Sequence, residues 1–169
     1  PRSVASIGDN AFDFCYNLRD ISVDEGNEAY ASVDGVLFNK ERTVLVTYPA
    51  GKENTAYTIP DGVTNVGRSA FWDCMLTSIV IPESVTKIEW DAFRDCSNLK
   101  DVTIGDYALN KFGICRIEKN ENLETLSFGN ACFENGIDLQ LNSNPCSISQ
   151  HQICHNFMIC ISETTSLRS

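Results

Sequence analysis

Apolar and polar residues recur along this chain with a period close to 22 residues. Residues 81–96 repeat residues 59–74, and Ile, Pro, Val, Thr, Ala, Phe, Asp and Cys return in the same places. The same frame opens the chain at residues 4–23. A fixed period of this length is typical of a solenoid, in which each repeat is one supersecondary unit stacked on its neighbours. The sequence therefore predicts a repeat protein.

The end of each repeat alternates apolar and polar residues, which is typical of a β-strand with one buried face. We expect these residues to point inward: Ile21, Val23, Ile79, Ile81, Val102, Ile104, Leu126 and Phe128. Strands stacked in register would form a parallel sheet. A short extended V-x-x-I segment and an A-F-x-x-C turn segment complete the unit. We expect Phe12, Phe71 and Phe93 to stack as a spine between the two sides.

The frame is interrupted between the first two copies, because Phe12 and Phe71 are 59 residues apart. In this interval the β-rich runs 36–38 and 44–48 flank a polar turn, which indicates a β-hairpin. The hairpin could project as a binding element, or it could replace the turn of one repeat and leave the stack intact. We favour the second interpretation.

The repeat pattern decays after Ile104. Residues 122–128 still match the frame, whereas residues 129–169 depart from it. We therefore expect one repeat region at residues 1–128. The end repeats of solenoids are atypical, so residues 129–169 form either a degraded terminal repeat or a poorly ordered tail.

Composition excludes some classes of function. The net charge of −10 argues against a nucleic-acid-binding surface, which needs clustered Lys and Arg. No run reaches the ~18 apolar residues that a membrane span needs, and no signal peptide precedes the first repeat. We expect the chain to be a segment of a longer protein whose targeting signals, if any, lie outside it.

The eight cysteines are fewer than a disulfide scaffold of this length would contain. Three of them, Cys15, Cys74 and Cys96, occupy one repeat position, three residues after the Phe. A residue that follows the period of the fold is most simply a packing residue, and free Cys behaves as a small buried hydrophobe. We interpret these three as buried free thiols rather than disulfides or metal ligands.

Catalytic and metal-binding patterns are absent from the sequence. It has no Gly-rich phosphate loop, nucleophile elbow or H-E-x-x-H motif, and its carboxylates are scattered. The two histidines lie four residues apart, close to three cysteines, but these spacings fit no standard zinc pattern. These five residues are His151, His155, Cys146, Cys154 and Cys160. We predict no enzyme activity, no metal site and no cofactor.

The pattern I-G-x-x-A-F-x-x-C-x-x-L-x-x-I-x-I-P-x-x-V is visible at residues 7–23 and 66–85. It resembles the BspA-like, TpLRR-type class of leucine-rich repeats, and residues 34–52 resemble the hairpin insertion of its bacterial members. The resemblance implies an α/β-type solenoid rich in β, wound as a right-handed superhelix with a parallel sheet on its concave face. One β-hairpin would be inserted at about residues 30–51. The resemblance also implies a surface or secreted protein that binds or adheres to host or matrix proteins.

Two functions remain from different classes. The first is a non-catalytic protein-binding or adhesion module, whose outward sheet residues line a concave face. These residues are Asp20, Ser22, Asp24, Ser78, Val80, Asp101, Thr103, Thr125 and Ser127. The alternative is a structural spacer of a larger multi-domain surface protein, with no ligand of its own.

Overall fold

The structure is a computed structural model built from strands and turns. It describes residues 1–108, 120 and 122–129 in full, and the backbone of residues 114–117, 138–142, 147–150 and 158–162. Within these residues there is no helix, so the α component of the expected α/β-type solenoid is missing. The A-F-x-x-C segments form tight turns instead; for example, the N–H of Cys74 donates to the carbonyl of Phe71 at 3.2 Å.

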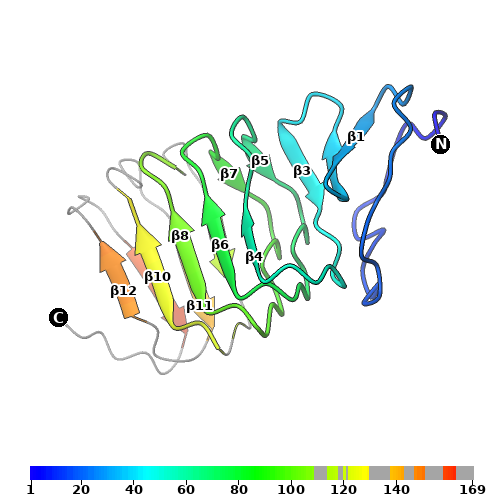
Figure 1. Ribbon diagram of the computed structural model, residues 1–169. Coiled ribbons are helices and arrows are strands. Elements are labelled where there is room, and N and C mark those ends of the chain that lie inside the picture. Colours follow the sequence, from blue (N-terminus) through cyan, green and yellow to red (C-terminus); the bar gives the residue numbers. More distant parts are fainter. Residues whose placement is uncertain are drawn as a thin grey trace.

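One parallel sheet, called the long sheet below, takes one strand from each successive turn of the solenoid, or rung (Figure 1). Its strands are β4 (Ala56–Thr58), β6 (Ser78–Ile81), β8 (Asp101–Ile104), β10 (Thr125–Phe128) and β12 (Ser147–Gln150). Side chains alternate along them as predicted: Ile79 and Ile81 are buried, and Val80 between them is exposed. This alternation directs one face of the long sheet into the core.

The opposite side of the stack carries a second sheet (Figure 1). It contains β1 (Tyr30–Val33), β2 (Val36–Asn39), β3 (Val44–Thr47), β5 (Asn65–Val66) and β7 (Lys87–Ile88). The V-x-x-I segments provide β5 and β7, whose inward residues Val66 and Ile88 are buried. A third sheet contains β9 (Ile114–Ile117), β11 (Asp138–Asn142) and β13 (Met158–Ser162).

The segment between the first two repeat copies forms the start of the second sheet. β1 and β2 pair antiparallel, as do β2 and β3, and β3 then pairs parallel with β5. The β-rich runs therefore pair across the polar turn and continue into the stack. The hand of the superhelix, the position of its concave face and the identity of this meander as an insertion stay predictions.

An aromatic spine fills the core between the sheets, but its first member differs from the prediction. The ring of Phe71 stacks on Phe93 with centroids 5.0 Å apart, and on Tyr48 at 5.3 Å. The N–H of Tyr48 donates to the carbonyl of Ala70 at 2.7 Å, just as the N–H of Phe71 donates to that of Ala92. Tyr48 thus takes the place that we expected Phe12 to occupy.

The first repeat copy is displaced outward from the stack as a result. Phe12 is half-buried, and residues 21–23 form no strand, so the predicted strand there is wrong. Cys15 is exposed, which contradicts its predicted burial. By contrast, Cys74 and Cys96 are buried free thiols, as predicted, with their sulfur atoms 3.5 Å apart.

The turns share an unusual backbone conformation. Of the nine non-glycine residues with positive φ in the described part of the chain, seven recur at two repeat positions. The position two residues before the Phe of the A-F-x-x-C motif holds Asn10, Ser69 and Asp91, and Tyr107 holds the equivalent place before Leu109. The position two residues after the Phe holds Phe14, Asp73 and Asp95. Asn and Asp adopt this left-handed conformation most readily. Phe14 and Tyr107 are bulky, so each adopts it at a cost of roughly 1–2 kcal/mol.

Candidate binding surfaces

The outward face of the long sheet presents two straight columns of short side chains. Strand pairing is in register, so residues at the same place in successive rungs lie side by side. One column contains Ser78, Asp101 and Thr125, and the other contains Val80, Thr103 and Ser127. Long side chains are absent from both columns, which leaves this part of the face flat and open to a large partner.

Six of the nine residues predicted for a binding face therefore share the long sheet. The other three, Asp20, Ser22 and Asp24, lie outside it, because no strand forms at residues 21–23. Asp20 accepts a hydrogen bond from Lys52 at 2.8 Å. The carboxylate of Asp24 accepts from the N–H of Gly26 and from Arg2, and these bonds lower its pKa.

A second candidate surface lies on the turns that precede the long-sheet strands. It is a cavity of about 420 Å³, called the notch below. The notch is lined by Asn10, Asp13, Phe14, Arg68, Ser69, Trp72, Asp91, Arg94 and Asp95. The lining falls into three groups of three residues from three rungs, drawn mostly from equivalent repeat positions. Nothing in the repeat pattern alone predicts a cavity at this place.

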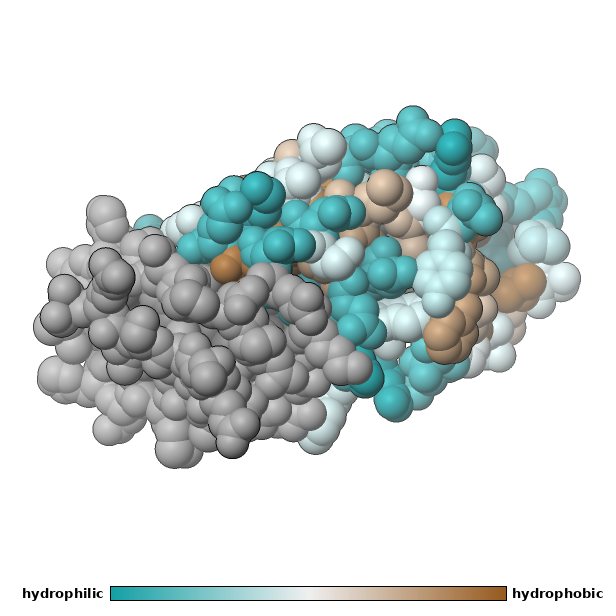
Figure 2. Space-filling view, turned by 90° about the horizontal axis from the view of Figure 1, so that it is seen from below, coloured by the Kyte–Doolittle hydropathy of each residue, from teal (hydrophilic) through white to brown (hydrophobic). Residues whose placement is uncertain are grey.

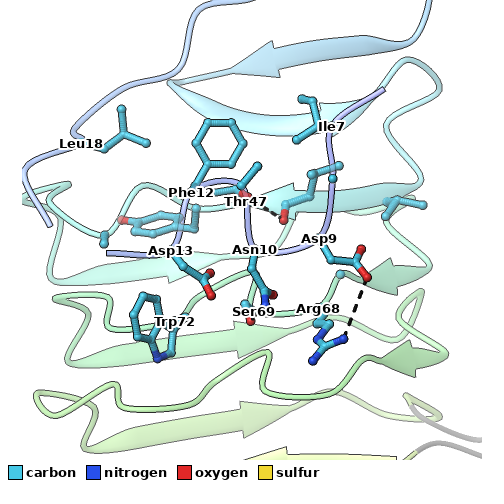
Figure 3. A pocket seen from close by; sticks show the side chains of 17 residues that line it. Ile7, Asp9, Asn10, Phe12, Asp13, Leu18, Thr47, Arg68, Ser69 and Trp72 are labelled. Atoms are coloured by element: carbon cyan, nitrogen blue, oxygen red, sulfur yellow. Dashed lines mark hydrogen bonds and ion pairs between the residues drawn. The ribbon is translucent and has the colours of Figure 1, made fainter. Parts of the chain in front are cut away.

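The displaced first repeat opens the notch and a smaller cavity of about 160 Å³ beside it. Because Tyr48 occupies the spine, residues 8–15 lie over the turn of the next rung instead of stacking in line with it. In Figure 3, the apolar side chains Ile7, Phe12 and Leu18 lie at one end of the smaller cavity. The polar residues Asn10, Asp13 and Ser69 lie at the other end with Trp72. These four residues line both cavities.

Contacts between rungs and within one rung hold the polar side chains of the notch. The indole N–H of Trp72 donates to Oδ2 of Asp95 at 3.1 Å. Arg94 Nη1 lies 3.4 Å from Oδ1 of Asp91, and Arg94 Nε lies 3.5 Å from Oδ2 of Asp95. That Nε is buried and makes no hydrogen bond. On the opposite wall, the hydroxyl of Ser69 lies 3.4 Å from Oδ1 of Asn10.

Aromatic rings cover one side of the notch. Phe14 packs edge-to-face against Trp72, with centroids 4.7 Å apart and planes at 86°. The ring of Tyr16, which is not part of the notch lining, has its centroid 6.3 Å from that of Trp72. Phe14 is 69% exposed and Tyr16 is 53% exposed, so both rings face solvent. Seen from below, the molecule likewise shows hydrophobic side chains dispersed among hydrophilic ones (Figure 2).

The carboxylates of the turns lie in partly desolvated surroundings. Burial raises the pKa of Asp13, and Asp91 raises it further, while the nearby guanidinium of Arg68 opposes the shift. Burial and the charge of Asp95 likewise raise the pKa of Asp73. Both shifts indicate that a negative charge here is less well solvated than on an open surface.

The repeats place the chain in a known family. Residues 1–44 and 50–140 match the pattern of the BspA type leucine rich repeat region, in six copies. The chain belongs to this family. The predicted resemblance is therefore confirmed. No curated protein matches the sequence.

Solved structures of bacterial leucine-rich repeat proteins share the fold. A leucine-rich repeat protein from Eubacterium ventriosum is 25% identical to this chain, with a TM-score of 0.71. The match covers 89% of this chain and 47% of the Eubacterium chain. The pneumococcal vaccine antigen PcpA is 26% identical, with a TM-score of 0.66, and the match covers 97% of this chain and 44% of PcpA. A leucine rich cell surface protein from Faecalibacterium prausnitzii is 25% identical, with a TM-score of 0.64, and the match covers 90% of this chain and 47% of the Faecalibacterium chain. The BspA-type chain thus spans less than half the length of each.

The described residues contain no group of three His, Cys, Asp or Glu side chains that could hold a metal ion. The histidines and cysteines weighed as a metal site in the sequence, residues 146–160, lie outside the fully described residues. No helix in the described part is long and apolar enough to cross a membrane.

Proposed function

We propose that this chain is a non-catalytic protein-binding or adhesion segment of a surface leucine-rich repeat protein, and that it binds through the outward face of the long sheet. The observation that carries the proposal is the pair of in-register columns of short side chains. A partner protein can lie flat across such a face and contact several rungs at once.

The composition of the face supports a protein ligand. Asp101 lies in the middle of one column and is exposed, and Val80 in the other column is 39% exposed. A face that mixes apolar, hydroxyl and charged groups is compatible with a non-obligate protein interface, which as a whole is about as apolar as the rest of a protein surface. The two columns lack the enclosed, aromatic-lined shape that small-molecule sites have.

The relatives support a location outside the cell. One solved relative is described as a cell surface protein and another as a vaccine antigen. By analogy with them, the whole protein is displayed on the surface or secreted. The resemblance to the BspA-like family extends the proposal to host or matrix proteins as its partners. The long-sheet face is then the concave face of the solenoid, with Asp20, Ser22 and Asp24 extending it beyond the sheet.

Charge reversal on the sheet face tests the proposal. Binding of the chain to immobilised extracellular-matrix proteins is measured by biolayer interferometry, for the unmodified chain and for Asp101→Arg and Ser78→Arg. We expect each variant to bind at least about tenfold more weakly, because a long cation would separate a flat partner from the sheet. Thermal unfolding should be unchanged, because both side chains lie on the outward face of the long sheet, where they alternate with buried residues.

Glu83→Arg is the matched control, since it reverses an exposed carboxylate in the turn after β6 and should leave binding intact. Equal binding by all variants would refute the sheet face as the binding surface. A chain that retains no matrix protein would favour the alternative, a structural spacer.

A further inference from the structure

We propose that the notch binds a neutral saccharide. This site lies on the turns and not on the long-sheet face, so it is separate from the proposed protein-binding function. The proposal rests on the aromatic wall of the notch, the balance of its charges and the polar groups that line it.

Each ring of the aromatic wall, Trp72 and Phe14, offers a flat apolar face of the kind on which sugar rings pack, and the two ring planes lie at 86° to one another. The axial C–H groups of a pyranose ring make one face of the sugar apolar, and that face packs on aromatic rings. Trp72 is held in place by its hydrogen bond to Asp95 and by its T-shaped contact with the ring of Phe14. The wall is therefore already ordered before a ligand arrives, which lowers the entropic cost of binding.

The charges of the notch favour a ligand without net charge. Three carboxylates (Asp13, Asp91 and Asp95) and two guanidiniums (Arg68 and Arg94) line it. An anionic ligand would meet the carboxylates, and a cationic ligand would meet the guanidiniums. A sugar hydroxyl both donates and accepts, so it can bond to a carboxylate and an arginine at the same time.

Polar capacity remains available inside the notch. The buried Nε of Arg94 makes no hydrogen bond and has only a long ion-pair contact, 3.5 Å to Oδ2 of Asp95, which is unusual for a buried donor in a native structure. The Ser69–Asn10 contact is long at 3.4 Å, so both groups can turn toward a ligand. The volume of about 420 Å³ is within the range of roughly 300–1,000 Å³ that small-molecule sites show.

The backbone of Phe14 provides an independent indication. Phe14 adopts a left-handed conformation at a position where the next two rungs carry Asp73 and Asp95, which tolerate it better. It also exposes 69% of its surface. A strained residue that gains little burial is a reasonable candidate for a ligand contact.

Intrinsic fluorescence of one tryptophan tests the proposal directly. The chain has two tryptophans, so Trp90→Phe leaves Trp72 as the sole indole reporter. This variant is titrated with maltotriose, cellotriose, lactose and chitotriose, each up to 10 mM (roughly the range of weak binding). We expect at least one of these neutral sugars to shift the emission of Trp72 saturably. Absence of a saturable shift with all four would overturn the proposal.

Saturation-transfer NMR with the same sugar then locates the site. Trp72→Ala and Phe14→Ser should each weaken binding by about tenfold or more, because each removes part of the aromatic wall. Phe14 is exposed, so Phe14→Ser keeps the test valid if Trp72→Ala fails to fold. Tyr107→Ser is the matched control: Tyr107 is also an exposed aromatic residue with positive φ, but it lies outside the notch.

The control variant should bind the sugar like the unmodified chain. Equal weakening by Tyr107→Ser would overturn the location in the notch. Stronger binding of 3′-sialyllactose than of lactose, or of a lysine-rich peptide than of any sugar, would overturn the assignment of a neutral ligand.

Discussion

Two regions of this molecule contain the same A-F-x-x-C repeat motif but occupy different environments. In the rung that contains Phe71, the A-F-x-x-C segment buries its Ala, Phe and Cys. In the first copy, the segment that contains Phe12 leaves Ala11 and Cys15 exposed and Phe12 half-buried. The difference arises because Tyr48 has taken the place next to Phe71. A repeat motif therefore specifies which face can be buried, and the neighbouring rung decides whether it is.

Thiol reactivity should separate the two regions most strongly. Cys15 should react rapidly with iodoacetamide. Cys74 and Cys96 should react at least about a thousandfold more slowly, because they become accessible only on unfolding. Burial also raises the pKa of Cys96 well above its ordinary value, which lowers its thiolate fraction. Peptide mapping by mass spectrometry distinguishes these thiols from the other cysteines. Comparable labelling of Cys15 and Cys96 in the native protein would contradict the difference in burial.

Truncation of the two phenylalanines should differ in the same direction. Phe71→Ala should lower the free energy of unfolding by about 3–5 kcal/mol, because it removes the middle ring of the spine. Phe12→Ala should cost about half as much or less, since Phe12 is only half-buried. Urea denaturation followed by circular dichroism measures both. Equal losses would place Phe12 back in the spine.

Tyr48 should behave as a substitute for a spine phenylalanine. Its hydroxyl is buried and makes no hydrogen bond. Tyr48→Phe should therefore keep or raise the free energy of unfolding, by up to about 1 kcal/mol, because it removes an unsatisfied buried group. Tyr57→Phe is a matched control at a less buried ring that contacts Tyr48. A marked loss of stability in Tyr48→Phe alone would show that the hydroxyl has a partner.

The smallest expected effect concerns pH. The pKa of Asp13 is raised above its ordinary value of 3.8, so ionisation of this carboxyl disfavours the folded state. That destabilisation is complete above the folded-state pKa and disappears as pH falls toward 3.8. Asp13→Asn should therefore be slightly more stable than the unmodified chain at pH 7, and the difference should shrink on acidification. Thermal melts from pH 7 to pH 4 measure this; a constant difference would argue against the shift.

The regular part of the fold could be predicted because its signals are local and repeated. Alternation at residues 78–81 and 101–104 predicts both the strands and their buried faces, and the common period predicts their pairing. Chain spacing also contains a signal for Tyr48, which precedes Phe71 by 23 residues, close to one repeat length. The A-F-x-x-C motif predicts Phe12 as the spine neighbour of Phe71 instead, because Tyr48 belongs to a segment without that motif.

The candidate sites differ in how far the sequence predicts them. The outward residues of β6, β8 and β10 follow from alternation alone, since the pleat places every second residue outside. The notch depends on Asp13, Trp72 and Arg94 meeting across three rungs after the first repeat has been displaced. That displacement results from packing between segments that are distant in the sequence, so no local sequence pattern predicts it.

The in-register pairing gives this protein an adjustable length. Residues 67–88 contain one complete turn of chain, and residue 89 continues from Ile88 as Gly67 continues from Val66. A second copy of these 22 residues, inserted after Ile88, would lengthen the molecule by one strand spacing of about 4.8 Å. Duplication or deletion of such 22-residue segments in the gene would therefore change the distance between the two ends of the molecule in equal steps.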